Sequence, residues 1–460
     1  MEAGCSFGPY LSTCAGGLEN VLLQELASRL YGVQVLSSHA GATVFSTSGR
    51  PEDLKALRAA DNIYAYLIHK EGVPLDKEQG LAYLQAIAME IDWGRALATF
   101  RQWNPGVAII AWPSSNSSEG CSAALPRFRV TCERRTLKLP KHGYTSMEAA
   151  GWLGAGVGAL LGWPVSMTHF DVELIATITD DEVLLSLSLL YSPRAKQNAS
   201  ATGPPDAANE MGREEEPLQA KAHHQSRQLY SHRPYRSDLV RTSLKPSTAY
   251  ALCQLADIRP GHVVLDPLCG CGTIPLEAAD FYGPSIAAFA GELLEDAVAK
   301  AGRNLAAGQQ GGRPGPCDVI RWDATRLPWR DRTVDRVISD MPFGILCGSP
   351  KERNNVFPSV LKEIARVLVP GTGRAVLLCQ GRKVRADLKR VPTRDFFLLE
   401  KTFSIDMEGI LVDVHILQRT EVEVVVKPRL TPNRRRDRSR QRKGAANLTG
   451  LPAAFVDPME

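Results

Sequence analysis

The stretch from Asp266 to Ala279 constrains the fold of this chain more than any other part of the sequence. It follows the apolar run 263–265, contains Gly270 and Gly272, and leads into a helical pattern, so it predicts a strand, a glycine-bent loop and a helix start. Glycines allow the backbone to approach a ligand closely, and the first helical turn offers unpaired N–H groups. The spacing differs from the three-glycine dinucleotide fingerprint. We therefore expect a nucleotide-like cofactor here.

A second motif, Asp340 to Gly344, follows the apolar strand predicted at 337–339. It places the Asp340 carboxylate, a turn fixed by Pro342 and the Phe343 ring together at a strand end. Open α/β sheets bind their substrates at that edge. The alternative role for Asp340 is a simple turn cap.

Apolar runs alternate with helical patterns after residue 245, which predicts a parallel, doubly wound sheet. The strands are expected at 262–266, 286–290, 317–321, 334–339, 373–379 and 411–417. Glu292 ends the second of these strands, where an acid can accept hydrogen bonds from ribose hydroxyls, and its alternative role is a helix N-terminal charge. The fold class is thus α/β with a Rossmann-like domain.

Together the two motifs resemble those of S-adenosylmethionine-dependent N-methyltransferases. That family usually has Asp/Asn-Pro-Pro-Tyr/Phe, and Met341 replaces the first proline here. The resemblance implies that Asp340 accepts a hydrogen bond from the target amine, that the backbone at Pro342 supplies a second acceptor, and that Phe343 stacks on the base. It also implies that Asp323 holds the adenine amino group, with a loop cap as the alternative. The expected cofactor-binding residues are Asp266, Pro267, Cys269, Gly270, Gly272, Thr273, Glu292, Asp323 and Asp340.

The ten cysteines form no Cys-x-x-Cys pair and no Cys/His ligand spacing. This distribution predicts reduced thiols inside a cell and no structural metal site. Cys269 and Cys271 are separated by one residue inside the glycine loop, where small-side-chain packing is favoured over a redox role.

The start of the chain has no secretory signal pattern, so a cytoplasmic location is expected. Residues 149–168 lack charge but contain glycines and Pro164, which favours a helix and turn of a soluble domain over a membrane span. Residues 427–443 hold nine Lys/Arg and one Asp. This tail indicates nuclear import or phosphate attraction, with a solvated tail as the alternative.

Three segments in the first half resemble the strand, helix and later strand of a THUMP domain, an RNA-binding module that recognises the tRNA acceptor arm and its 3′ end. They are residues 128–134, 144–150 and 168–173. Elsewhere in this half, 18–30 and 54–60 are predicted as helices and 43–45 as a strand. The predicted organisation is a ferredoxin-like domain at 1–84, a THUMP domain at 85–192, a linker at 193–228, a methyltransferase domain at 229–426 and a basic tail at 427–460.

The order of these parts is similar to that of the eukaryotic THUMP-domain tRNA guanosine-N2-methyltransferases. The resemblance implies formation of N2-methylguanosine in the tRNA acceptor stem and a small zinc-binding activator subunit that adds a strand to the catalytic sheet. Glu292 replaces the family's usual aspartate. The alternatives are methylation of another RNA, such as a small nuclear RNA, and a non-catalytic RNA-binding assembly factor.

A run of basic residues in the THUMP-like half is the candidate RNA contact, and a solvated charged face is its alternative. Tryptophans in this half, including Trp93 and Trp152, are expected to be core or cover residues more than base-stacking platforms. The candidate RNA-binding residues are Arg129, Arg134, Arg135, Lys138 and Lys141.

Overall fold

The structure is a computed structural model, and it describes most of the chain outside the predicted linker and tail. Residues Met1–Glu421 form one unit and Val422–Glu460 form a second. The predicted linker at 193–228 and the basic tail at 427–460 lie outside the described residues. The described residues are 7–105, 125–135, 140–189, 233, 235–240, 243–310, 315–341, 350–379, 388, 393–407 and 409–424.

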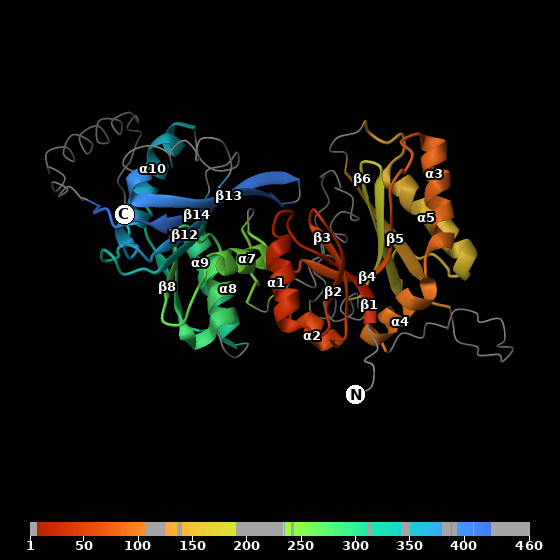
Figure 1. The fold of residues 1–460 in the computed structure, drawn as a ribbon, viewed down its shortest axis with the longest axis horizontal. Coiled ribbons are helices and arrows are strands. Elements are labelled where there is room, and N and C mark those ends of the chain that lie inside the picture. The colour runs from red at the N-terminus through yellow and green to blue at the C-terminus, as the bar shows by residue number, and fades with distance from the viewer. Residues whose placement is uncertain are drawn as a thin grey trace, which may run out of the picture. The chain divides into compact units, whose positions relative to one another are not determined.

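The first half of the chain builds a seven-stranded sheet with the strand order β2-β3-β1-β4-β7-β6-β5 (Figure 1). Antiparallel pairing of β4 with β7 joins strands from both predicted N-terminal domains into this one sheet. The predicted boundary at residues 84 and 85 lies inside helix α3 (Lys77–Ala86), and the domain limits stay a prediction. The strands are β1 (Phe7–Thr13), β2 (Gln34–His39), β3 (Ala42–Thr47), β4 (Asn62–Lys70), β5 (Phe128–Arg135), β6 (Val172–Thr179) and β7 (Glu182–Ser188).

The helices of this half follow from local capping and from tertiary contacts. A capping box of Thr145 and Glu148 starts α5 (Ser146–Leu161), and Gly162, with φ 69°, ends it. The uncharged stretch 149–168 is therefore a helix and a turn, as predicted. Among the described residues no helix is long and apolar enough to cross a membrane. The other helices are α1 (Glu19–Arg29), α2 (Pro51–Lys55), the 3₁₀ helix η1 (Ile87–Glu90) and α4 (Trp93–Trp103).

The helix predicted at 54–60 is wrong in its extent, because α2 ends at Lys55. The backbone N–H groups of Arg58 and Ala59 donate to the buried carboxylate of Glu25, at 2.9 and 2.7 Å. A distant side chain thus replaces the helical acceptors of these two groups, and local propensity does not decide the segment.

The second half builds another seven-stranded sheet, in the order β10-β9-β8-β11-β12-β14-β13. Strands β8 to β12 pair in parallel, as predicted, but β14 runs antiparallel to β12. A hairpin with Gly409 at φ 90° joins β13 to β14, and the sequence reading missed β13. The strands are β8 (Val263–Asp266), β9 (Ala287–Glu292), β10 (Cys317–Arg321), β11 (Arg336–Asp340), β12 (Arg374–Cys379), β13 (Phe397–Met407) and β14 (Ile410–Arg419).

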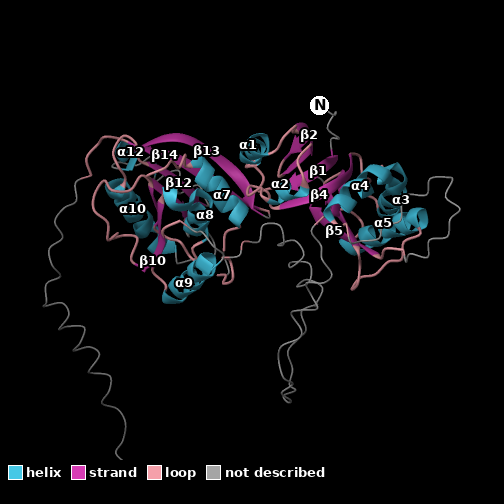
Figure 2. Cartoon of the chain, turned by 90° about the horizontal axis from the view of Figure 1, so that it is seen from below, coloured by secondary structure: helices cyan, strands magenta, loops and turns pink. Residues whose placement is uncertain are grey.

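Helices flank the second sheet, as expected of a Rossmann-like domain, and Figure 2 shows them in cyan beside the strands. Helix α8 (Thr273–Tyr282) starts directly after the glycine loop and packs on the buried strands β8 and β9. The remaining helices are α7 (Pro246–Leu255), η3 (Gly283–Ser285), α9 (Glu295–Gln310), α10 (Pro350–Val367) and α12 (Thr393–Phe396). The predicted α/β class is confirmed.

Candidate functional site

Asp266 and Asp340 end the two neighbouring central strands of the second sheet. Strands β8 and β11 pair in parallel, and the chain continues from β8 toward β9 but from β11 toward β12, on the other side. This is the topological switch point, where open α/β sheets bind ligands. The Ser339 hydroxyl donates to Asp266 Oδ1 at 2.8 Å and links the two strand ends.

The glycine loop bends back over the end of β9. Gly270 and Gly272 have φ 54° and 85°, a left-handed conformation that disfavours residues with a Cβ. The Cys269 N–H donates to the Gly291 carbonyl at 2.8 Å, and the Gly270 N–H donates to Glu292 Oε2 at 3.1 Å. The loop is therefore fixed before any ligand binds, with the N-terminus of α8 directly behind it.

Glu292 ends β9 as predicted, and its two oxygens serve different groups. Oε2 holds the glycine loop, whereas Oε1 accepts from the N–H groups of Leu293 and Leu294 at 2.8 and 3.0 Å, just ahead of α9. The structure thus shows the alternative role, a charge ahead of a helix N-terminus, and adds a contact with the glycine loop that the sequence did not predict. A contact between Glu292 and ribose stays a prediction.

Asp323 lies two residues beyond β10, and its carboxylate closes a local turn. Asp323 Oδ1 accepts from the backbone N–H and the hydroxyl of Thr325, at 2.8 and 2.7 Å. This is the geometry of the loop-cap alternative. The side chain is exposed near the end of β9, so its predicted role toward adenine remains a proposal.

Trp322 is a site residue that the sequence reading missed. Its indole N–H donates to the Pro267 carbonyl at 3.1 Å, which ties the loop after β8 to the end of β10. A Cβ at Gly291 would fall inside the Trp322 ring, so only glycine fits at that position of β9. The sequence signal for this contact was Gly291, which directly precedes the acid at the end of the strand.

The site collects negative charge in a poorly hydrated place. Burial, and to a smaller extent the neighbouring carboxylates of Asp340 and Glu292, raises the pKa of Asp266 to about 7. Burial raises the pKa of Asp340 to about 7 as well. Three carboxylates at adjacent strand ends favour a ligand that carries positive charge.

The two cysteines of the loop are buried packing residues. Burial raises the pKa of the Cys269 thiol well above its ordinary value, so the thiol stays protonated and unreactive. Cys271 Sγ lies 3.2 Å from the Ser243 hydroxyl and 3.5 Å from that of Thr273. Among the described residues no group of three or more His, Cys, Asp or Glu is arranged to hold a metal ion.

Two predicted catalytic residues, Pro342 and Phe343, lie outside the described residues, so their roles stay predictions. Met341, the last described residue before them, is buried, and its N–H donates to the Leu378 carbonyl at 2.8 Å. The hydrogen bonding of β11 to β12 therefore continues one residue beyond Asp340.

The candidate RNA-binding residues separate into different environments. Arg129 is 6% exposed, forms an ion pair of 2.6 Å with the buried Glu173 and lies 3.9 Å from the centre of the Phe170 ring. A guanidinium buried in this way is not available to phosphate, and Arg129 is removed from the candidate RNA surface. Its position in β5 places Arg129 opposite Glu173 of β6, which accounts for the ion pair. Arg135 is exposed at the end of β5.

Two of the other RNA-binding candidates, Arg134 and Lys141, lie among the described residues. Arg134 is half-buried, donates to the Ser146 hydroxyl at 3.3 Å and lies over the Tyr144 ring. Lys141 is exposed, and Lys138 lies outside the described residues. Trp93 is buried in the core, as expected, whereas Trp152 on α5 is 44% exposed.

Substitutions at Arg129 and Arg135 are expected to have opposite effects. Arg129→Ala leaves Glu173 as a buried charge without its main partner, and we expect a loss of about 3–5 kcal/mol in unfolding free energy. Arg135 stays a candidate RNA contact, so we expect Arg135→Ala to change stability little and to weaken RNA binding with a reduced salt dependence. Chemical denaturation and filter binding at several salt concentrations measure both effects. Equal loss of stability in the two variants would contradict the assignment.

The strand order, the switch-point carboxylates and the fixed glycine loop are those of a Rossmann-like ligand-binding domain. Residues 233–393 match the family model of the RMKL-like methyltransferase domain. The tRNA (guanine(6)-N(2))-methyltransferase THUMP3 of Bos taurus is 31% identical over 315 residues, which cover 66% of this chain and 54% of that protein. The resemblance expected from the sequence is therefore confirmed. The chain spans about half the length of the mammalian relatives that it matches.

Bacterial relatives match along nearly their whole length. The tRNA (guanine(6)-N2)-methyltransferase of Thermus thermophilus is 26% identical over 417 residues, covering 89% of this chain and 98% of that protein. The crystal structure of TrmN from Thermus thermophilus superposes with a TM-score of 0.59 at 25% identity, over 89% of this chain and 99% of that one. The similarity to TrmN therefore extends over both the N-terminal sheet module and the domain that follows it.

Proposed function

We propose that this chain is an S-adenosylmethionine-dependent tRNA methyltransferase that forms N2-methylguanosine in the acceptor stem. The observation that carries the proposal is the placement of Asp340 beside Asp266 at the switch point, in a chain similar to tRNA guanine(6)-N2-methyltransferases over two thirds of its length. The pre-formed glycine loop also speaks against a non-catalytic assembly factor.

The residues present fit the proposed cofactor. S-adenosylmethionine carries a sulfonium and an ammonium group, and the raised pKa of Asp266 near two other carboxylates marks a place that lacks positive charge. The left-handed glycines leave the backbone open on the loop that would receive it. When bound, this cofactor supplies an activated methyl group.

Asp340 has the position and the protonation range for its proposed role. The exocyclic N2 of guanine is a poor nucleophile because its lone pair is conjugated with the ring, so orientation of the amine limits the reaction. The Asp340 carboxylate accepts a hydrogen bond from N2–H. As the C–N bond forms, N2 must lose one proton, and a carboxylate with a pKa of about 7 can accept it. A base in a stem must first leave its stack, at a cost of about a few kcal/mol.

Cofactor affinity is expected to rise with pH through neutrality. Below about pH 7 Asp266 and Asp340 are protonated in the free protein, and above it the Asp266 carboxylate offers negative charge to the cationic ligand. Stability has the opposite sign: the folded state binds these protons more tightly than the unfolded state, so stability falls as pH rises from about 4 to 7. Calorimetry between about pH 6 and 8 measures the affinity. Asp266→Asn should flatten the profile, and a flat wild-type profile would contradict the assignment.

We further propose a small zinc-binding activator subunit as partner, docked on the edge strand β10. Within the described residues β10 pairs with β9 alone, so one row of its backbone groups is open to another strand. Ile320 on this strand is 42% exposed, and Leu293 and Leu294 beside it are 53% and 66% exposed. The Arg321 guanidinium donates to the Leu293 carbonyl at 3.1 Å, so these apolar groups adjoin one another.

Ile320→Lys tests this docking site against a matched control at the opposite sheet edge, Leu398→Lys on β13. Leu398 is 61% exposed, so both changes place a lysine on an exposed edge strand. We expect Ile320→Lys alone to weaken the complex with the co-expressed subunit by about tenfold or more. Co-purification and calorimetry provide the measurement. Equal affinities of the two variants would place the partner elsewhere.

The proposed function is tested by incubating the purified chain, alone and with the activator subunit, with labelled cofactor and either total tRNA or small nuclear RNA. Digestion to nucleosides then identifies the product. We expect N2-methylguanosine from tRNA, with the label in the acceptor stem. Label in small nuclear RNA alone would replace the substrate, and no label in any RNA under both conditions would contradict the enzymatic role.

A further inference from the structure

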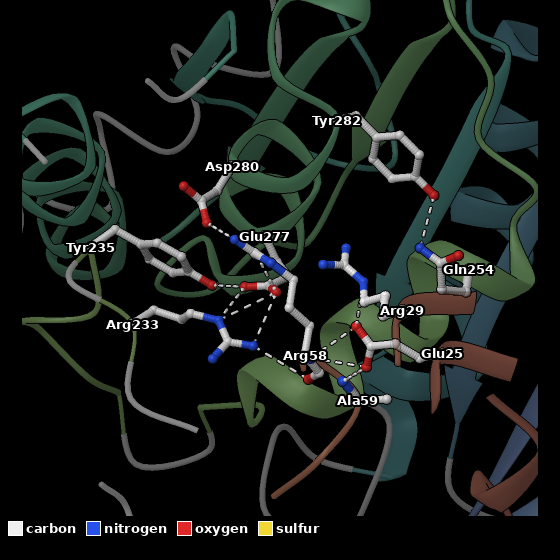
Figure 3. Close-up of polar contacts among 10 residues, drawn as sticks. All are labelled: Glu25, Arg29, Arg58, Ala59, Arg233, Tyr235, Gln254, Glu277, Asp280 and Tyr282. Atoms are coloured by element: carbon white, nitrogen blue, oxygen red, sulfur yellow. Dashed lines mark hydrogen bonds and ion pairs between the residues drawn. The ribbon is translucent and has the colours of Figure 1, made fainter. Parts of the chain in front are cut away.

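A group of charged and aromatic residues joins the N-terminal module, defined as residues 7–189, to the catalytic domain (Figure 3). Arg58 follows α2 and reaches helix α8 of the catalytic domain. Its Nη1 donates to Glu277 Oε1 at 2.6 Å, and its Nη2 contacts the Asp280 carboxylate. One guanidinium therefore binds two carboxylates on adjacent turns of a helix, a fixed geometry that a lysine cannot reproduce.

Glu277 is buried and fully occupied by partners from both sides of this contact. Its side chain is 0% exposed and accepts from Arg233 Nε at 3.2 Å and from the Tyr235 hydroxyl. Arg233 in turn donates to the backbone carbonyl of Arg58 at 3.3 Å. The contact thus includes the side chain and the main chain of the same N-terminal residue.

The backbone around Arg58 is itself held in place. Glu25, buried on α1, accepts from the N–H groups of Arg58 and Ala59, and Arg29 pairs with Glu25 at 3.2 Å. Both guanidinium groups lie over the Phe281 ring of α8, with centroid distances of 5.6 Å for Arg58 and 5.2 Å for Arg29. Because its backbone is fixed by its own module, Arg58 transmits the position of that module to α8.

Two further contacts hold the same two parts together at different elements. Asp61 accepts from Lys245 Nζ at 2.9 Å and from the Ser247 hydroxyl, at the start of α7. The Asp406 N–H of β13 donates to the Gly16 carbonyl at 2.8 Å. A single contact would allow the two parts to pivot, and each contact on another element removes part of that freedom.

The contacted helix is also the helix of the cofactor loop. Helix α8 begins at Thr273, directly after Gly272, so Glu277 lies about one turn, or about 6 Å along the axis, from the loop. The same sheet carries Asp340 at the end of a neighbouring strand. A shift of the N-terminal module on α8 would therefore change the distance between that module and the reacting groups.

We propose that Arg58 is a positioning residue that fixes the N-terminal module on helix α8 and thereby sets which base of a bound acceptor stem reaches Asp340. The proposal rests on the proposed function for its RNA part. The N-terminal module holds the end of the tRNA, the catalytic domain holds the target base, and the separation between them selects the modified position.

Arg58→Met removes the contact with little other damage. Glu277 keeps Arg233 and Tyr235 as partners, Asp280 is 33% exposed and is solvated, and the bonds of Glu25 to the backbone do not need the side chain. Arg50→Met is the matched control, because its paired guanidinium contacts Asp53 within the N-terminal module. Arg58→Lys keeps the charge but can reach only one carboxylate at a time, and it should rescue partially.

The first measurement does not depend on activity. Spin labels attached through unnatural amino acids at Met89, which is 70% exposed, and at the exposed Asp318 on β10 report the distance between the two parts. We expect a single narrow distribution in the full-length wild type and in Arg50→Met, and a broader or shifted one in Arg58→Met. An unchanged distribution in Arg58→Met would overturn the proposal.

The second measurement uses tRNA with an acceptor stem lengthened or shortened by one base pair. We expect the wild type and Arg50→Met to discriminate against the altered stems, and Arg58→Met to reduce that discrimination in kcat/KM by about fivefold or more. In Arg58→Met, label should also appear at guanosines next to the position that the wild type methylates. A general folding defect would lower all rates together and leave the ratio unchanged, which would count against the proposal. If the wild type methylates no tRNA, the proposed function fails, and the distance measurement still decides whether Arg58 fixes the module.

Discussion

Asp340→Ala is expected to lower the rate of the proposed methyl transfer to tRNA by about 10²–10³-fold while cofactor affinity changes little. The carboxylate ends β11 at the proposed position of the target amine, and burial raises its pKa to about 7. Removing it deletes the acceptor for the amine and the group that takes the proton, whereas the glycine loop keeps its own contacts through Glu292. Single-turnover assays with labelled cofactor measure the rate, and calorimetry measures binding.

Two further variants test whether the loss of rate arises from the Asp340 carboxylate itself. Asp340→Asn keeps the shape and one acceptor oxygen but cannot take a proton, so it should retain more activity than alanine and lose the rise of rate through pH 7. Asp331→Ala removes a carboxylate that is 59% exposed, in the loop before β11, and should leave the rate unchanged. Wild-type turnover in Asp340→Ala would remove Asp340 from the active site.

Gly270→Val is expected to weaken cofactor binding by about 100-fold or more. The residue has φ 54°, a conformation that costs residues with a side chain about 1–2 kcal/mol, which accounts for about tenfold. The rest is expected from the branched side chain, which the proposed cofactor loop must accommodate beside Val240. Gly270→Ala brings the strain without the branch and should lose about tenfold. Calorimetry with S-adenosylmethionine or its demethylated product measures both.

Gly302→Ala provides the control for a glycine replaced nearby. Gly302 lies in α9 with helical backbone, and a Cβ there meets no atom within 4 Å, so binding should be unchanged and stability equal or slightly higher. Thermal unfolding of all three variants separates loss of binding from loss of fold. If Gly270→Val binds the cofactor as well as Gly302→Ala does, the loop is not the cofactor site.

Local patterns in the sequence were sufficient for the centre of the catalytic domain. The strands at 262–266 and 317–321 and the acid at the end of the second strand were predicted from apolar runs and their flanking residues, and the structure contains them within one or two residues. These features depend on short segments, in which burial of a strand and a break at glycine are encoded within a few residues.

Predictions that depended on distant partners were less successful. The helix expected at 54–60 ends early because Glu25 takes the N–H groups of Arg58 and Ala59. Strand β14 is antiparallel because it returns through a hairpin from β13, a strand whose pattern is half exposed. Arg129 belonged to a run of basic residues but faces Glu173 on the neighbouring strand. A charge pattern carries no information on which face of a strand is covered.

The sequence by itself determined the class of the catalytic domain and the order of its motifs, because the glycine loop and Asp340 follow strands whose ends meet at one edge of a parallel sheet. Only the tertiary structure decided how these groups are tuned and held. The pKa of Asp266 is raised by burial and by carboxylates from two other strands. Arg58 meets Glu277 across 219 residues of chain. Burial and contacts between distant segments arise only when the chain is folded, and no local pattern records them.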